Sequence, residues 1–144
     1  MSDAGRVLIA DDDDAIRNLV GRILELEGLP YDAVRDGRAA IECLRKHEYA
    51  VLLVDLMMPV MSGYDVLDYV KANPRPGTVL VMTAVADTDL RRLDGNVVTT
   101  VVRKPFDIQR LAILVRDAAI RSAEEMGQPS DNVLPFPGTA PGNR

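Results

Sequence analysis

Short apolar runs alternate along this chain with segments in which apolar residues recur every three or four positions. Their length and their β-branched residues are typical of strands, and the first run is apolar throughout, as in a strand covered on both faces. The runs cover residues 7–10, 31–34, 50–54, 78–82 and 97–102. The sequence therefore predicts five strands, each followed by a segment of helical period.

Capping residues, glycines and a proline mark the ends of these helical segments. We expect helices between Asp13 or Asp14 and Gly28, over about 38–46, from about 63 to the residue before Pro74, around 88–93, and from Asp107 to about 122. Strands that alternate with helices through short connections predict a doubly wound α/β domain, whose parallel sheet is covered on both faces. A length of 144 residues allows one such domain.

Residues 127–144 differ in composition from the rest, because they hold four of the nine prolines and three of the ten glycines. We therefore expect a domain over 1–126 and a disordered tail over 127–144. The alternative is an arm in which Val133, Leu134 and Phe136 dock on the domain or on a partner. In either case the tail is too short to be an output domain, so the chain is expected to act as a single domain.

Composition excludes several classes of partner. Aromatic residues make up 4% of the chain and tryptophan is absent, which leaves little material for stacking on bases, so no direct contact with nucleic acid is expected. No apolar stretch approaches the ~18 residues of a spanning helix, and the N-terminus lacks the pattern of a secretion signal. The single cysteine, Cys43, fits a reducing compartment. These features predict a cytoplasmic protein without membrane contact.

Polar side chains follow four of the five predicted strands. Ligand sites in doubly wound folds lie at the carboxyl ends of the strands, so these side chains should converge on one edge of the sheet. They are Asp11 and Asp12, Asp55, Thr83 and Lys104. Three neighbouring carboxylates repel one another unless they bind protons or a cation, and Mg²⁺ favours a few carboxylates together with waters and phosphate oxygens. The sequence thus predicts a Mg²⁺ site at this edge.

Beside such a metal, Thr83 and Lys104 would supply a donor and a positive charge to the oxygens of a transferring phosphoryl group. Asp55 is then the candidate nucleophile. Asp13 and Asp14 fit the start of a helix, where acidic residues suit the dipole.

Four motifs, in this order, resemble the receiver domain of bacterial two-component response regulators. They are the run 7–13, the segment from Asp55 through Pro59 to Gly63, residues 82–84, and Lys104-Pro105-Phe106. The resemblance covers about residues 5–123. It implies a flavodoxin-like (βα)₅ fold with a five-stranded parallel sheet of order 2-1-3-4-5.

The resemblance also implies a function. Asp55 would accept a phosphoryl group from the phosphohistidine of a sensor histidine kinase or a phosphotransfer protein. The Mg²⁺, for which Mn²⁺ could substitute, would be held by Asp11, Asp12, Asp55 and the backbone carbonyl of Met57, with Asp12 bound directly and Asp11 mainly through water. Thr83 and Lys104 would contact the phosphoryl oxygens. Such a protein catalyses its own phosphorylation and dephosphorylation and is not an enzyme acting on other substrates.

In receivers the fourth helix, fifth strand and fifth helix form the face that communicates phosphorylation to a downstream effector. Basic residues gather in this part of the chain, at Arg91, Arg92, Arg103, Arg110 and Arg116. Either these residues are a solvated surface, or they contact an acidic partner or a second copy of the chain. The protein is expected to be a monomer or a weak homodimer.

The family's frequent aromatic switch residue is replaced by Val101, so a switch of that kind is in doubt. Met57 and Val85 occupy the positions that influence hydrolytic water, and since both are apolar we expect slow autodephosphorylation.

Two other functions are compatible with the same residues. A receiver-like binding module could have lost phosphorylation, although the full set of site residues argues against this. A metal-dependent phosphatase with an aspartyl nucleophile commonly needs a second aspartate two residues later, and that position holds Met57.

Overall fold

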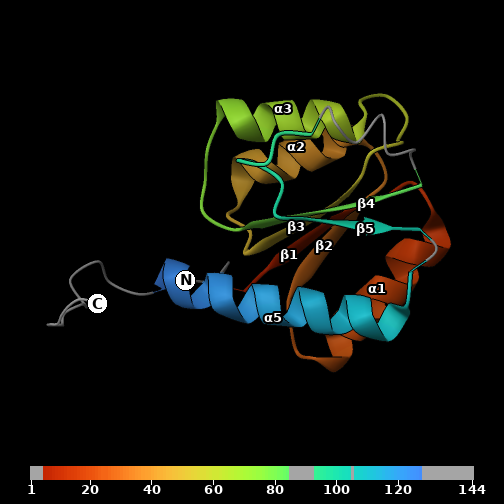
Figure 1. The fold of residues 1–144 in the computed structure, drawn as a ribbon, viewed down its shortest axis with the longest axis vertical. Coiled ribbons are helices and arrows are strands. Elements are labelled where there is room, and N and C mark those ends of the chain that lie inside the picture. Colours follow the sequence, from red (N-terminus) through yellow and green to blue (C-terminus); the bar gives the residue numbers. More distant parts are fainter. Residues whose placement is uncertain (1–4, 85–92, 105, 128–144) are drawn as a thin grey trace, which may run out of the picture.

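The structure, a computed structural model, describes residues 5–84, 93–104 and 106–127 (Figure 1). Five parallel strands form one sheet in the order β2-β1-β3-β4-β5, which confirms the predicted topology. The strands are β1 (Val7–Ala10), β2 (Tyr31–Val34), β3 (Val51–Asp55), β4 (Thr78–Thr83) and β5 (Thr100–Arg103).

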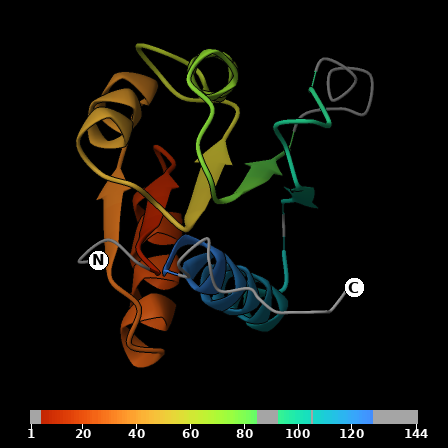
Figure 2. The same cartoon turned by 90° about the vertical axis from the view of Figure 1, so that its left-hand side faces the viewer.

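Helices cover both faces of the sheet. Viewed across the sheet, α2 and α3 lie on one side and α1 and α5 on the other (Figure 2). The helices are α1 (Asp14–Leu26), α2 (Gly37–Lys46), α3 (Gly63–Ala72) and α5 (Ile108–Gly127). The helix predicted around 88–93 lies outside the described residues except for its last position, and the predicted tail lies outside them from residue 128. Within the described ranges, no helix has the length and apolarity needed to cross a bilayer.

The sheet separates two apolar cores. Along β1, Leu8 and Ala10 face the core under α2 and α3, whereas Val7 and Ile9 face the core under α1 and α5. All four are fully buried, so this strand is covered on both faces, as its apolar run predicted. Burial on both sides fixes the register of the strand, because a slip by one residue would exchange the two sets of side chains.

Side-chain caps fix where the helices begin, and so how the chain leaves each strand. Asp13 accepts hydrogen bonds from the backbone N–H groups of Ala15 at 2.8 Å and Ile16 at 3.3 Å, so the predicted cap at Asp13 is confirmed. Asp107 caps α5 in the same way by accepting from Gln109 N at 2.9 Å. Ser62 begins α3 with a capping box.

The start of β5 differs from the prediction. The β-branched run suggested a strand over 97–102, but β5 covers Thr100–Arg103. The chain turns at Asp94, whose carbonyl oxygen accepts from Val97 N and Val98 N at 2.9 Å, and whose side chain accepts from Asn96 N at 2.8 Å. These local hydrogen bonds hold the first residues of the run in a turn, so pairing with β4 begins only afterwards.

Candidate functional site

The polar residues predicted at the strand ends meet at one edge of the sheet. Asp11 follows β1, Asp55 is the last residue of β3, Thr83 is the last residue of β4, and Lys104 follows β5. Parallel pairing places them side by side, and Lys104 N donates to the carbonyl oxygen of Thr83 at 2.9 Å. The Thr83 side chain is fully buried. The sheet topology thus assembles a site from residues up to 93 positions apart, from Asp11 to Lys104.

Three carboxylates form the centre of the site. Asp11, Asp12 and Asp55 each offer one oxygen, and these oxygens lie within 4.8 Å of one another. Asp11 and Asp55 are buried, whereas Asp12 is exposed. The cluster therefore combines two acids removed from solvent with one that reaches solution.

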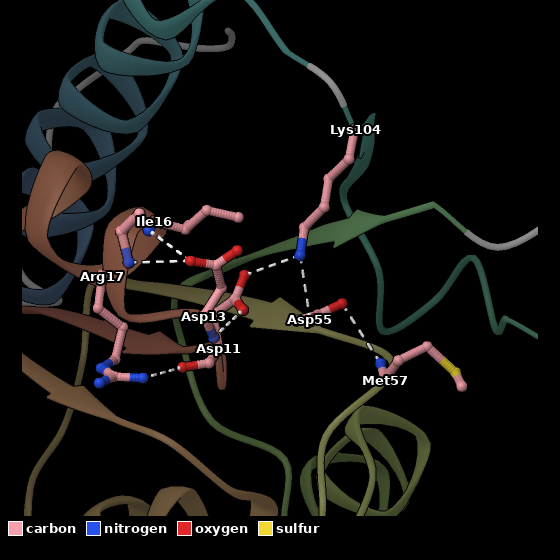
Figure 3. A network of polar contacts seen from close by, with 8 residues as sticks. Asp11, Asp13, Ile16, Arg17, Asp55, Met57 and Lys104 are labelled. Atoms are coloured by element: carbon pink, nitrogen blue, oxygen red, sulfur yellow. Dashed lines mark hydrogen bonds and ion pairs between the residues drawn. The ribbon is translucent and has the colours of Figure 1, made fainter.

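Lys104 lies between the two buried acids. Its Nζ is 3.0 Å from Asp11 Oδ2 and 3.2 Å from Asp55 Oδ2 (Figure 3). Backbone groups hold the other carboxylate oxygens, since Met57 N donates to Asp55 Oδ1 at 3.3 Å and Asp13 N donates to Asp11 Oδ1 at 2.9 Å. Both acids are thus oriented on one side by the backbone and on the other by the ammonium group.

Burial and charge act in opposite directions on these groups. Burial raises the pKa of Asp55, and the negative charge of Asp11 raises it further, while Lys104 and the Met57 N–H partly oppose this. Burial alone would lower the pKa of Lys104, but its hydrogen bonds and ion pairs with Asp11 and Asp55 outweigh burial and leave that pKa raised. Lys104 is therefore a firmly charged ammonium group beside a carboxyl group that ionises with difficulty.

The donor set fits a hard divalent cation. The three carboxylates carry a nominal charge of −3 and Lys104 returns only +1, so −2 is left uncompensated. Asp11 Oδ2 is buried, and its partner among the described residues is the Lys104 ammonium, at 3.0 Å. Carboxylates are the ligands that Mg²⁺ and Mn²⁺ prefer, so the charge left over in this cluster suits such an ion.

The loop after Asp55 is held close to the site by a glycine. Gly63 N donates to the carbonyl oxygen of Leu56 at 3.0 Å, and a β-carbon at Gly63 would lie 2.3 Å from the carbonyl oxygen of Asp55. Within this loop Val60 has a φ of 69°, a left-handed conformation that a β-branched residue rarely adopts. The Met57 side chain is 64% exposed beside the site. That its carbonyl oxygen is a metal ligand stays a prediction.

One residue that contacts this site could not be singled out from the sequence. Arg17, in α1, donates from Nη1 to the carbonyl oxygen of Asp11 at 2.8 Å (Figure 3). The available signal was a cation one helical turn after the acidic run, where it can pair with Asp14. Such spacing is common on exposed helices and does not by itself indicate a site.

A groove of about 650 Å³ lies between β5 and α5. Its lining combines apolar side chains, among them Phe106, with two basic residues, Arg103 and Arg110, and two acidic residues, Asp107 and Asp117. Val101 also lines it and is 36% exposed. Of the other basic residues predicted for this surface, Arg116 lies on α5, while Arg91 and Arg92 are outside the described residues.

Comparison with known proteins identifies similar chains. The response regulator receiver domain, as a family, matches residues 7–116. The transcriptional regulatory protein TrcR of Mycobacterium tuberculosis is 30% identical over 131 residues, which cover 90% of this chain and 50% of TrcR. Across the first curated relatives that it matches, the chain spans 26% to 50% of their length.

Solved structures are similar over nearly their full length. The signal receiver domain of a putative Luxo repressor protein from Vibrio parahaemolyticus is 28% identical with a TM-score of 0.77, and the match covers 86% of this chain and 97% of that one. The response regulator protein TrrA from Thermotoga maritima, solved in complex with Mg²⁺-BeF, is 25% identical with a TM-score of 0.68, and the match covers 78% and 97%.

Proposed function

This chain belongs to the response regulator receiver domain family, and we propose that it accepts a phosphoryl group on Asp55 from the phosphohistidine of a sensor histidine kinase or a phosphotransfer protein. The observation that carries the proposal is the position of Lys104 Nζ, within 3.2 Å of Asp55 and 3.0 Å of Asp11, beside a three-carboxylate cluster. A cation paired with a buried acid at the end of a parallel strand suits charge stabilisation during phosphoryl transfer.

In the transfer, a carboxylate oxygen of Asp55 attacks the phosphorus atom and forms an O–P bond. The P–N bond to the donor histidine breaks, and its electron pair returns to the imidazole, which takes up a proton. Lys104 contacts the phosphoryl oxygens as they arrive, and the Thr83 hydroxyl donates to them. In a separate hydrolysis step, water attacks phosphorus, the O–P bond to Asp55 breaks, and its electron pair returns to the Asp55 carboxylate. Inorganic phosphate leaves and the proton of the attacking water goes to solvent, and through this step the domain would catalyse its own dephosphorylation.

Asp11, Asp12, Asp55 and the Met57 carbonyl oxygen would hold Mg²⁺, with Mn²⁺ as a possible substitute. When bound, the ion compensates the charge that the carboxylates and the phosphoryl oxygens share. Asp12 is the exposed member of the cluster and would bind directly, and Asp11 would act mainly through water. The closeness of the three carboxylate oxygens, within 4.8 Å of one another, and the net charge of the cluster support this assignment.

The signal is proposed to leave through protein contact at the surface formed by β5 and α5. The groove there exposes apolar side chains beside Arg103 and Arg110, which would contact an acidic partner segment or a second copy. Asp107 and Asp117 also line it, so the charged residues of the lining balance. Val101 in place of an aromatic residue implies that output does not depend on rotation of a ring at this position. That the receiver works as a single domain in the cytoplasm stays a prediction.

A phosphodonor experiment tests the central proposal. Purified protein is incubated with Mg²⁺ and acetyl phosphate, and intact mass spectrometry follows the gain of one phosphoryl group. Asp55→Ala should gain none, and Asp68→Ala, which removes an exposed acid of α3, should behave like the wild type. A wild type that stays unmodified with acetyl phosphate and with phosphorylated kinase would favour a binding module. Phosphate release at many turnovers from added phosphate esters would instead favour a phosphatase.

A further inference from the structure

Arg17 contacts the backbone between two of the proposed metal ligands and not their side chains. Its Nη1 donates to the carbonyl oxygen of Asp11 at 2.8 Å, and this carbonyl belongs to the peptide group that joins Asp11 to Asp12. In Figure 3 the guanidinium group lies against that carbonyl, on the side away from Lys104. The contact is thus placed where it controls the direction in which the chain continues to Asp12.

The geometry of a peptide group explains why this contact matters. The group is planar, so fixing its carbonyl oxygen also fixes its N–H and strongly restricts the Cα of the next residue. The turn at this point is further held by Asp13 N, which donates to Asp11 Oδ1 at 2.9 Å. Asp12 has the exposed carboxylate of the cluster, so the direction of its side chain depends on this backbone more than on packing.

Arg17 is itself held in place. Its Nη2 pairs with Asp14 Oδ1, and the same oxygen lies 3.7 Å from Arg35 Nη2. The Arg17 side chain is 16% exposed, whereas the side chains of Asp14 and Arg35 are 69% and 68% exposed. A partly buried guanidinium with two partners loses little further freedom, and its planar donors suit a fixed contact better than a lysine would.

We propose that Arg17 is a positioning residue for the Asp11–Asp12 pair, which orients the peptide between them so that both carboxylates point into the cation site. This inference rests on the proposed function, because it assigns Arg17 a role toward the ion that the cluster would bind. Arg17 does not contact the reacting atoms and acts through the two acids.

Electrostatics and positioning predict opposite changes in Mg²⁺ affinity when Arg17 is replaced. Removing a positive charge near a cation site should, by charge alone, tighten Mg²⁺ binding. If Arg17 positions the ligands, Arg17→Met should instead weaken it. Arg17→Lys keeps the charge and loses the planar pair of donors, so it isolates the geometric contribution and is also the milder change for folding.

The test is calorimetric titration of the full chain with Mg²⁺. We expect Arg17→Lys to weaken binding about tenfold, as is typical for residues that orient metal ligands, and Arg17→Met to weaken it by a similar factor. The control is Arg22→Met on the same helix, whose side chain is 72% exposed and pairs only with Glu25 among the described residues, at 3.9 Å. It should bind Mg²⁺ as the wild type does or slightly more tightly.

A second measurement on the metal-free protein separates positioning from general damage. Hydrogen exchange at the Asp13 amide should be faster in Arg17→Lys, because the turn that it closes with Asp11 is less well held, while amides of β3 keep their protection. Wild-type Mg²⁺ affinity in Arg17→Lys, or tighter binding in Arg17→Met, would overturn the inference. A wild type that binds no Mg²⁺ would overturn the proposed function instead, so the two failures are distinguishable.

Discussion

The ammonium nitrogen of Lys104 lies 3.2 Å from Oδ2 of Asp55, so the charge that would meet an incoming phosphoryl group already contacts the carboxylate that would accept it. The same ammonium group also pairs with carboxylates that a divalent cation would bind, so it competes with that cation. Lys104 therefore has two opposed effects, on cation binding and on transfer, and a substitution should separate them.

Lys104→Met should bind Mg²⁺ roughly tenfold more tightly and accept the phosphoryl group at least about tenfold more slowly. The first effect follows from removal of a competing cation, and the second from loss of charge at the phosphoryl oxygens. Calorimetry measures the first effect, and a time course of intact mass with acetyl phosphate measures the second. Lys71→Met is the matched control, because Lys71 pairs with Asp94 at 3.0 Å, away from the three acids. Unchanged Mg²⁺ affinity in Lys104→Met would contradict the prediction.

Asp55→Asn should stabilise the metal-free protein at neutral pH. The raised pKa of Asp55 means that the folded protein holds this proton more tightly than the unfolded chain does. The resulting stabilisation is complete below the ordinary value of 3.8 and is lost as pH rises through the folded pKa. Asn cannot titrate, so its stability advantage should grow as the pH rises from 4 to 7.

Urea denaturation of both proteins at pH 4 and pH 7, with and without Mg²⁺, checks this sign. Mg²⁺ should stabilise the wild type more than Asp55→Asn, since the variant lacks one carboxylate ligand. An advantage for Asp55→Asn that shrinks with rising pH would contradict the assignment.

Val60→Asn should raise the free energy of unfolding by roughly 1 kcal/mol. Val60 holds a φ of 69° with its side chain 73% exposed, so the backbone is strained and little packing is lost on substitution. Asn tolerates this conformation better than valine. Val60→Ala keeps a β-carbon without gaining that tolerance and should stabilise less. Equal gains in both variants, measured by chemical denaturation, would mean that the conformation is not the cause.

Gly63→Ala should destabilise the protein by about 2–4 kcal/mol, because its β-carbon would meet backbone atoms of Asp55 and Leu56. The displaced Asp55 should also accept phosphoryl groups more slowly. Gly95→Ala is the control, since a β-carbon there has nothing within 4 Å. A denaturation midpoint for Gly63→Ala equal to that of Gly95→Ala would show that the loop can move aside freely.

Phosphorylated wild-type protein should lose its phosphoryl group slowly, and Met57→Asn should lose it several times faster. An apolar, exposed Met57 side chain beside Asp55 offers no group that orients water, whereas an amide offers a donor and an acceptor. Isolation of the phosphorylated protein, followed by intact mass over time, measures both rates. Decay of the wild type within seconds would refute the expectation.

The doubly wound fold class, and the meeting of polar residues at one edge of the sheet, could be predicted for one physical reason, whereas the strand order came from the resemblance to receiver domains. A parallel sheet brings the carboxyl ends of all its strands to one edge, so Asp11, Asp55 and Lys104 could be found as the polar residues that end apolar runs. Hydrophobic period and caps sufficed for this, because both are local properties of the chain.

The features that were missed or misjudged depend on contacts between residues, which the spacing of apolar residues along the chain does not reveal. Side-chain and backbone hydrogen bonds form a turn at Asp94, and β5 therefore begins later in the chain than predicted, although the residues after Asp94 favour a strand. Val60 adopts a conformation that its own residue type disfavours. The contact of Arg17 with the Asp11 carbonyl requires the relative placement of α1 and β1, which only the folded chain defines.

The two cores on opposite sides of the sheet have a consequence for how such a chain can diverge. Neighbours such as Leu8 and Ile9 pack against different sets of helices, so the helices of one side can be exchanged for others while those of the opposite side stay as they are. The acidic edge is built from the strand ends that both layers share. A change in the outer surface of one layer, and with it the choice of partner, therefore leaves the strand-end acids in place, whereas the inner contact of Arg17 ties α1 to them.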